Sequence, residues 1–439
     1  MSVGERIRNA IPLRNNASSV RWLACALLLW GAGSAGAQTR DTTRARIDSL
    51  AARLERTEER VKVLEQQLAA ESESSVKTRS RVALEFHGRA IVNAFTNNRR
   101  VNSTGDPLFV RPDDPGDPTP QGLAMQVRQS SLGLAITAPH VWGARFTGDL
   151  DVDFVGGQLP SSGGRTFPLI RMRTMRAILA WPHAELLLGQ ESPLVAGVNP
   201  LSLASLGTPG FVAAGNLWLW LPQARVTVER GTALRLGLQA AVLAPGTAAA
   251  VGTFDVPDFD VAERSKRPFL ETRARLRWGQ DDMAAEIGVG EHVGWFLTAL
   301  DTLARGFAST IDAQVPITHL IEIRGEAYEG RGARALGGGA IGQLFGINAV
   351  LIRSRGMWAQ VNVRPSPALV FGVGYGVDDP HDTDLAASSR LKNEAAAIHA
   401  EWRPAGPLVF GFEYRRLRTT YLPQAYANDH LNLAFGFEF

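Results

Sequence analysis

Strict alternation of apolar and polar residues is the feature of this sequence that most limits its fold. In the last ten residues, every second position is taken by Leu431, Leu433, Phe435, Phe437 and Phe439. Successive residues of a β-strand point to opposite faces of the sheet, so this stretch is predicted to be a strand with one wholly apolar face. The sequence stops on Phe439 without a polar tail. We therefore expect a final strand whose apolar face meets something other than water.

The same pattern recurs along the chain, with strongly charged second faces. In residues 141–154, aromatic and aliphatic side chains alternate with three aspartates, and in residues 268–279 they alternate with three arginines. A soluble core would not accept such a face unless that face were in contact with water. Alternating lipid-facing and lumen-facing residues are typical of a transmembrane β-barrel, where the two classes cancel in any average of hydropathy.

Sixteen segments show this alternation, and short connections between them take turns with long connections rich in Gly, Pro and Asp. We therefore predict an all-β transmembrane barrel of about 16 antiparallel strands over residues 82–439, rather than a soluble solenoid or sandwich. Its first and last strands are expected to pair and so remove both free edges. A change of parity within two segments, 123–138 and 170–181, indicates a bulge or a misplaced boundary. The predicted strands are 82–95, 123–138, 141–154, 170–181, 184–190, 223–230, 232–243, 268–279, 282–296, 305–315, 318–329, 356–364, 368–377, 394–403, 406–418 and 430–439.

Residues 1–37 have the features of a signal peptide. Four arginines precede a short apolar run at 22–30, and Ala35-Gly36-Ala37 forms a small-residue cleavage site. A lipidated Cys25 is the less favoured alternative, because Trp22 stands where a lipoprotein signal has a small aliphatic residue. Removal of four arginines and one glutamate brings the net charge from +3 to about zero, so no excess of basic charge indicates binding to nucleic acid.

Residues 38–71 are predicted to form a coiled-coil helix, followed by a polar linker at 72–81. The stretch 44–71 lacks Gly and Pro, and its apolar residues recur at alternating spacings of three and four. An amphipathic helix that lies on its own domain is the alternative. The apolar seam that would join the helices contains a mixture of Ile, Leu and Val, so it does not indicate whether the coiled coil is a dimer or a trimer. The seam residues are Ile47, Leu50, Leu54, Val61, Leu64 and Leu68.

Charged residues on the inner face are expected to decide which solutes pass such a barrel. Arginine is the best candidate, because guanidinium binds carboxylate or phosphate through paired hydrogen bonds and stays charged. Acidic residues are expected to face the arginines, and the alternative is that both groups are solvated residues that balance each other. The predicted anion-binding residues are Arg225, Arg235, Arg273, Arg275, Arg277 and Arg324, and the predicted acidic residues are Asp149, Asp151, Asp153, Glu322 and Glu326.

Two long connections, 191–222 and 330–355, are too apolar for loops that lie wholly in water. Each is expected to fold into the lumen as a constriction or to pack at a subunit interface. The second contains a G-x-G-x-x-G match at 337–342, but outside a βαβ unit this match does not indicate a nucleotide site. HExxH and G-x-S-x-G patterns are absent from the sequence, so we predict no enzymatic activity, no cofactor and no metal site.

The layout of signal peptide, coiled coil and barrel resembles the DcaP-type outer-membrane porins, relatives of the phosphate-selective porins. The resemblance spans nearly the whole mature chain, with local support from 176–181, Leu188-Gly189-Gln190 and the Gly-rich stretch after Tyr328. It implies trimers in the outer membrane of a Gram-negative-type bacterium and a coiled coil in the periplasm. It also implies passage of small anions such as dicarboxylates, and recognition of Phe439 by the barrel-assembly machinery.

Two functions follow from these observations. The first is a porin through which small hydrophilic solutes diffuse passively, with a preference for anions such as dicarboxylates or phosphate. The second is a mainly structural barrel whose coiled coil tethers the outer membrane to the cell wall or to a periplasmic partner. An enzymatic barrel is a weaker third possibility, because no catalytic pattern stands out in the sequence.

Overall fold

The computed structural model describes residues 76–77, 82–114, 116, 122–156, 169–205, 207–247 and 258–439. The predicted signal peptide and coiled coil lie outside the described residues, as does most of the predicted linker. The chain divides into two units, Met1–Glu85 and Phe86–Phe439. In the first unit, a two-residue strand β1 (Val76–Lys77) pairs antiparallel with the start of β2 (Ala83–Asn97).

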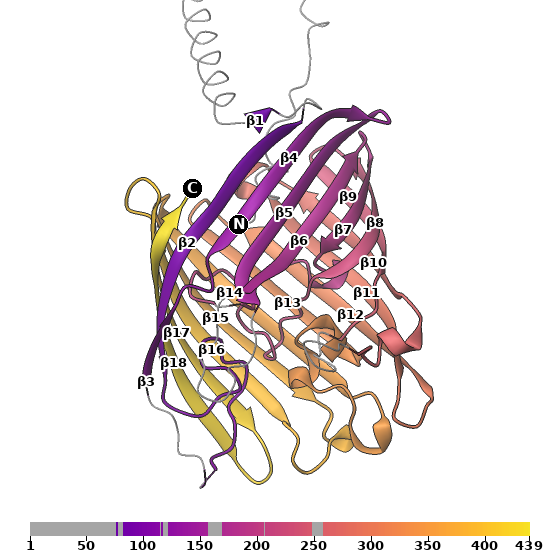
Figure 1. The fold of residues 1–439 in the computed structure, drawn as a ribbon, viewed down its shortest axis with the longest axis vertical. Helices are drawn as coiled ribbons and strands as arrows, with labels where there is room; N and C mark the ends of the chain where they lie inside the picture. The colour runs from indigo at the N-terminus through magenta and orange to yellow at the C-terminus, as the bar shows by residue number, and fades with distance from the viewer. Residues whose placement is uncertain are drawn as a thin grey trace, which may run out of the picture. The chain divides into compact units, whose positions relative to one another are not determined.

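The second unit is a closed barrel in which neighbouring strands are antiparallel (Figure 1). Every segment predicted from the alternation is a strand, and most boundaries agree within three residues. After β2, the strands are β3 (Gly122–Gln126), β4 (Ser131–Val141), β5 (Ala144–Gly156), β6 (Leu169–Ala180), β7 (Ala184–Glu191), β8 (Leu221–Gly231), β9 (Leu234–Leu243), β10 (Phe269–Trp278), β11 (Ala285–Leu297), β12 (Leu303–Pro316), β13 (Ile321–Arg331), β14 (Arg353–Ser366), β15 (Leu369–Pro380), β16 (Lys392–Trp402), β17 (Leu408–Thr420) and β18 (Ala425–Glu438).

The barrel closes by pairing its last strand with its first, as predicted. Phe435 lies opposite Val92 in the β18–β2 ladder, and the amide of Phe439 donates to the carbonyl of Gly88 at 3.0 Å. Both β3 and β4 pair with β2. These two strands follow one another along the same side of β2 and count as one strand of the barrel wall, so the barrel has 16 strands. The break between them explains the parity change within 123–138. A register shift opposite β6, between Asp151 and Val152, explains the change within 170–181.

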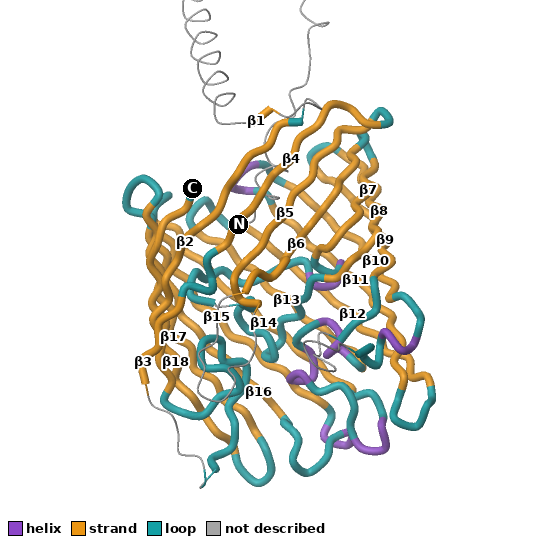
Figure 2. The backbone as a smooth tube through the Cα atoms, in the orientation of Figure 1, coloured by secondary structure: helices purple, strands orange, loops and turns teal. Residues whose placement is uncertain are grey.

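The connections differ in length at the two ends of the barrel. The barrel end where β2 begins and β18 finishes has short connections, such as residues 232–233 between β8 and β9. In Figure 2 the longer loops, drawn in teal, gather at the lower end of the barrel. Two connections expected to be long, 298–302 and 421–424, are instead tight turns. In the first of them, the amide of Thr298 donates to the carbonyl of Thr302 at 2.9 Å.

Several short 3₁₀ helices interrupt the connections. None of the helices in the described part of the chain is long and apolar enough to cross a membrane. The helices are η1 (Leu194–Ala196), η2 (Glu263–Ser265), η3 (Asp281–Met283), η4 (Ala333–Leu336), η5 (Gly339–Gly342), η6 (Ile347–Ala349) and η7 (Asp382–Asp384).

The two faces of the barrel wall differ in chemistry as the alternation predicts. Large apolar side chains such as Leu238, Val373 and Phe435 are exposed on the outer face. Polar residues such as Asn93 and Asn432 are buried on the inner face. A closed sheet with so many apolar side chains on its outer face is stable only in contact with lipid. Because the barrel is closed, no strand edge presents unpaired backbone N–H and C=O groups to that lipid.

Candidate pore lining

The predicted arginines of β8, β9 and β10 lie on one stretch of the inner wall, because these three strands are neighbours in the barrel. The β10 arginines alternate with outward Thr272, Ala274 and Leu276. Exposure of their side chains rises along the strand toward its short-turn end, from Arg273, which is nearly buried, to Arg277. Arg235 on β9 is the most exposed of the group.

Three carboxylates neutralise most of this charge. Asp312 binds Arg273 at 2.5 Å, and Glu286 binds the same guanidinium at 2.7 Å. Glu229 lies 3.1 Å from Arg275, 3.5 Å from Arg277 and 3.7 Å from Arg235. Among the described residues, these four arginines thus share three carboxylates through the ion pairs above, and positive groups outnumber negative groups by one.

Close contact between β10 and β11 depends on a glycine. Gly288 lies opposite Arg275 in the ladder, and a Cβ atom at Gly288 would stand 2.2 Å from Nη2 of Arg273. Because the glycine has no side chain, the guanidinium can cross β11 and reach Asp312 on β12. The arrangement holds Arg273 flat against the wall.

Arg225 lies on the same wall but contacts the backbone at the start of the preceding loop, between β7 and β8. Its Nη2 donates to the carbonyl of Ser192 at 2.5 Å, and its guanidinium also donates to the side chain of Gln223. The side-chain amide of Gln223 donates to the carbonyls of Glu191 and Ser192. These contacts secure the start of the connection between β7 and β8.

The predicted acidic residues of β5 each face a basic partner. Asp149 binds Arg176 at 2.7 Å, and Asp153 binds Arg171 at 2.6 Å. Asp151 lies 3.3 Å from Nε2 of His87. The wall formed by β5 and β6 is therefore a set of ion pairs rather than a field of free carboxylates.

None of the three arginines on β6 was among the residues predicted from the sequence to line the pore. Arg171 and Arg173 place their guanidinium groups 5.1 and 5.3 Å from the ring centre of Trp220. Arg173 faces inward because the register shift at Asp151/Val152 leaves it without an opposite residue on β5. The parity change in the sequence marked this irregularity, but it could not show which way Arg173 points.

Glu322, Arg324 and Glu326 on β13 hold a loop against the wall. Glu322 binds Arg324 at 2.7 Å, and Nη1 of Arg324 donates to the carbonyl of Asn199 at 2.8 Å. Glu326 accepts the amide of Leu217 at 2.9 Å and is almost fully buried. Arg324 and Glu326 thus contact the loop directly, and Glu326 does not face open lumen.

The loop itself, residues 192–220 between β7 and β8, crosses the inside of the barrel. It was expected to enter the lumen or to pack between subunits, and it contacts inner-wall residues on widely separated strands. Its amides and carbonyls bind Glu271 on β10 at 2.5 Å, Gln360 on β14 at 2.7 Å, and Asn432 on β18 at 2.7 Å. We call residues 192–220 the inner loop.

The connection 332–352 packs onto the inner loop. Trp218 donates through its amide to the carbonyl of Leu336 at 2.8 Å and through Nε1 to the carbonyl of Gly337 at 3.0 Å. Gly337 has φ +92°, and a Cβ atom there would lie 1.8 Å from the carbonyl oxygen of Trp218. The glycines of this stretch therefore permit close backbone packing, and the two loops together narrow the barrel.

Solved structures of similar fold are outer-membrane proteins. The outer membrane channel DcaP of Acinetobacter baumannii matches with a TM-score of 0.64 at 17% identity, over 83% of this chain and 100% of that chain. An anion-selective porin from Comamonas acidovorans matches at 0.51 and 12%, over 82% and 100%. OprB of Pseudomonas putida matches at 0.51 and 9%, over 81% and 94%. No protein-family model and no curated protein matches the chain. The likeness therefore establishes the fold, a closed antiparallel transmembrane β-barrel of the kind found in these outer-membrane proteins.

Proposed function

We propose that this protein is an outer-membrane porin through which small hydrophilic solutes diffuse passively, with a preference for anions such as dicarboxylates or phosphate. The observation that carries the proposal is the inner-wall cluster in which Arg235, Arg273, Arg275 and Arg277 share three carboxylates. Arg277 contacts both Glu229 at 3.5 Å and Glu286 at 3.3 Å. Arg235 has the longest contact with a carboxylate, 3.7 Å to Glu229, and the most exposed side chain of the four. Guanidinium groups on a water-filled wall attract carboxylate and phosphate by charge and by paired hydrogen bonds.

The charges of the β5–β6 wall fit the same function because they are paired. Asp149 and Glu191 bind Arg176, and Asp153 binds Arg171, so these carboxylates do not form an unpaired acidic surface that would repel anions. One protein of similar fold, from Comamonas acidovorans, is an anion-selective porin, and this likeness also supports a preference for anions. We also propose that the outer wall contacts membrane lipid and that three copies of the chain form a trimer joined by the predicted coiled coil.

Conductance of the purified protein in planar lipid bilayers tests the proposal. We expect stepwise openings and, under a salt gradient, a reversal potential that favours anions. The double variant Arg235→Gln/Arg277→Gln should lower the anion-to-cation permeability ratio about two- to fivefold. The reason is that the attraction between two opposite unit charges at close range in water is about 1 kcal/mol. A protein that inserts but never conducts would overturn the channel and favour the structural barrel.

A control on the same wall separates lumen charge from total charge. Arg230 is on β8, exposed on the face opposite to Glu229. Arg230→Gln removes one positive charge from the outer face and should leave ion selectivity unchanged. Equal effects of the Arg230 and Arg235/Arg277 variants would contradict the assignment of the pore wall.

A further inference from the structure

The outer wall of β14–β18 carries a band of charged side chains toward its long-loop end. Arg355 lies on β14, and Arg416 and Arg418 lie on β17, each at a position that alternates with a buried inward residue. Their acidic partners are Asp379 on β15, Glu394 on β16 and Asp429 on β18, at 2.9, 3.3 and 3.2 Å. These charges lie outside the lumen, so the proposed channel does not use them.

The basic members of this band project further than the acidic members. The side chains of Arg355, Arg416 and Arg418 are 71, 59 and 60% exposed, whereas those of Asp379, Asp429 and Glu394 are 34, 33 and 20% exposed. The carboxylates lie against the wall and the guanidinium groups extend from it. Lys392 on β16 also contacts Glu394, at 3.4 Å, and its side chain is 43% exposed. The surface that meets the surroundings is therefore basic.

Two tyrosines mark where this band meets the apolar wall. The hydroxyl of Tyr375 donates to Glu394 at 2.8 Å, and the hydroxyl of Tyr414 donates to Asp429 at 2.6 Å. Outward tyrosines at the edge of an apolar belt are typical of the membrane–water interface of a barrel. The arginines thus lie at the level of lipid headgroups.

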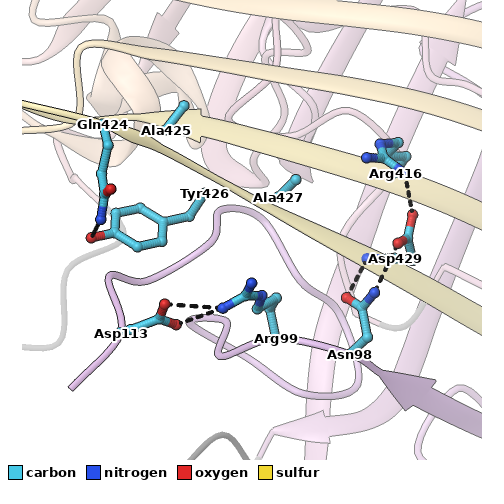
Figure 3. A pocket seen from close by; sticks show the side chains of 9 residues that line it. All are labelled: Asn98, Arg99, Asp113, Arg416, Gln424, Ala425, Tyr426, Ala427 and Asp429. Atoms are coloured by element: carbon cyan, nitrogen blue, oxygen red, sulfur yellow. Dashed lines mark hydrogen bonds and ion pairs between the residues drawn. The ribbon is translucent and has the colours of Figure 1, made fainter. Parts of the chain in front are cut away.

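A polar hollow of about 450 Å³ opens beside Arg416 (Figure 3). Figure 3 shows Arg416 on β17 with Asp429, and Arg99 on the loop after β2 with Asp113. Two guanidinium groups from separate elements therefore line one cavity. A cavity of this kind has room for a phosphate group and part of a sugar or glycerol headgroup.

An apolar groove of about 420 Å³ lies on the same wall. In the β16–β17 ladder, the groove residue Ile398 lies opposite Tyr414. Arg416 and Arg418 are two and four residues beyond Tyr414 on β17, which places them about 7 and 13 Å from the level of Ile398. This separation fits within one leaflet, whose hydrocarbon half is about 15 Å thick. The lining includes Val363, Phe371, Val373, Ile398, Ala400 and Phe412, with His399 as its one imidazole.

We propose that this wall binds a lipid whose headgroup carries anionic phosphate, with one phosphate at Arg416 in the polar hollow, a second at the neighbouring Arg418, and one acyl chain in the groove. Phosphate accepts hydrogen bonds from several guanidinium groups at once, and each arginine keeps donors besides those that meet its carboxylate. The apolar groove next to the basic band requires an amphiphile rather than a soluble anion. A protein partner would not need the tyrosine boundary that places the band at headgroup level.

Native mass spectrometry of the full-length protein in detergent tests the proposal with three probes. These are a diphosphorylated acylated glucosamine disaccharide (lipid A), the same lipid with both phosphates removed, and inorganic phosphate. The wild-type protein should retain the diphosphorylated lipid, should not retain the dephosphorylated lipid, and should keep the lipid in the presence of inorganic phosphate. Equal retention of both lipids, or displacement of the lipid by inorganic phosphate, would overturn the proposal.

Variants localise the site. Arg416→Ala/Arg418→Ala should reduce the bound fraction of the diphosphorylated lipid about tenfold, and Ala400→Leu should reduce it by filling the groove. The matched controls on outward positions of β12 and β13, Arg305→Ala/Arg331→Ala and Ala313→Leu, should leave it unchanged. Bilayer conductance of each variant shows that its barrel is folded. Loss of lipid in the control variants to the same extent as in the Arg416/Arg418 variant would show that general surface charge, not this site, retains it.

Discussion

The amide of Leu217 donates a hydrogen bond to the carboxylate of Glu326 across 2.9 Å, although the two residues are 109 positions apart in the chain. The carboxylate belongs to β13 and the amide to the inner loop, so this contact fixes the loop to the barrel wall. Leu217 is fully buried and Glu326 nearly so. The position of the loop, and with it the width of the channel, depends on such contacts.

Glu326→Ala should therefore release part of the inner loop. It leaves the buried Leu217 amide without its acceptor, which costs about 1–3 kcal/mol. We expect larger and noisier single-channel currents and a lower temperature for loss of the folded, compact electrophoretic form. Glu326→Gln keeps an acceptor oxygen and should behave like the wild type. Identical currents in the alanine variant and the wild type would show that this contact does not hold the loop.

Gly337→Ala should separate the two loops that narrow the barrel. Its Cβ atom would stand 1.8 Å from the carbonyl oxygen of Trp218, so the backbone must move. Gly342→Ala is a matched control, because Gly342 also has a positive φ, +72°, but no atom within 4 Å of the added Cβ. Both variants carry left-handed strain of about 1–2 kcal/mol. Only the Gly337 variant should change single-channel conductance, and equal conductance in the two variants would contradict the packing role.

The barrel could be predicted from sequence because its strands are specified locally. In β10, outward Leu270 and Leu276 alternate with inward Glu271 and Arg277, and a slip of one residue would place charges in lipid. The same rule pairs the first and last strands. Turn length is less well specified, since the tight turns 298–302 and 421–424 occupy the long-loop end of the barrel.

The candidate site was only partly predictable, because alternation assigns a face but not a partner. Arg273 and Glu326 are both on inward positions, yet Arg273 binds Asp312 on β12 whereas Glu326 is covered by Leu217. No local pattern reveals which inward residues a loop from the other side of the barrel will cover. The role of the arginines in ion selection stays a prediction until it is measured.

Arg176 is expected to be the most costly single residue to remove from the β5–β6 wall. It binds Asp149 at 2.7 Å and also binds Glu191, and all three side chains are largely buried. Arg176→Gln removes the cation that binds the buried Asp149 and one cation that binds Glu191, which should destabilise the fold by about 3–5 kcal/mol. Thermal loss of the compact electrophoretic form measures the effect. Arg145→Gln, at an exposed position of β5, is the control, and equal shifts for both variants would contradict the prediction.

Asp106 connects the loop after β2 to the inner loop. Its carboxylate accepts the amide of Thr208 at 3.1 Å, accepts the Thr208 hydroxyl, and lies 3.6 Å from Arg415. Burial raises the pKa of Asp106 to about 7 because it penalises the charged form, while Arg415 and the Thr208 hydroxyl oppose the rise and Glu413 adds to it. The protonated form is therefore favoured in the docked loops.

Docking of the loop that carries Asp106 should consequently weaken as pH rises. A carboxyl group whose pKa is higher in the folded state than in the unfolded state stabilises the folded state. For Asp106 this contribution is complete at pH values below the unfolded pKa, near 4, and it is lost as the pH rises through the folded pKa of about 7. We expect current fluctuations of single channels to increase over this range. Asp106→Asn mimics the protonated form and should keep the low-pH behaviour at high pH, whereas Asp113→Asn, an exposed carboxylate on the same loop, should follow the wild type. If Asp106→Asn channels still respond to pH as the wild type does, another group must control the docking.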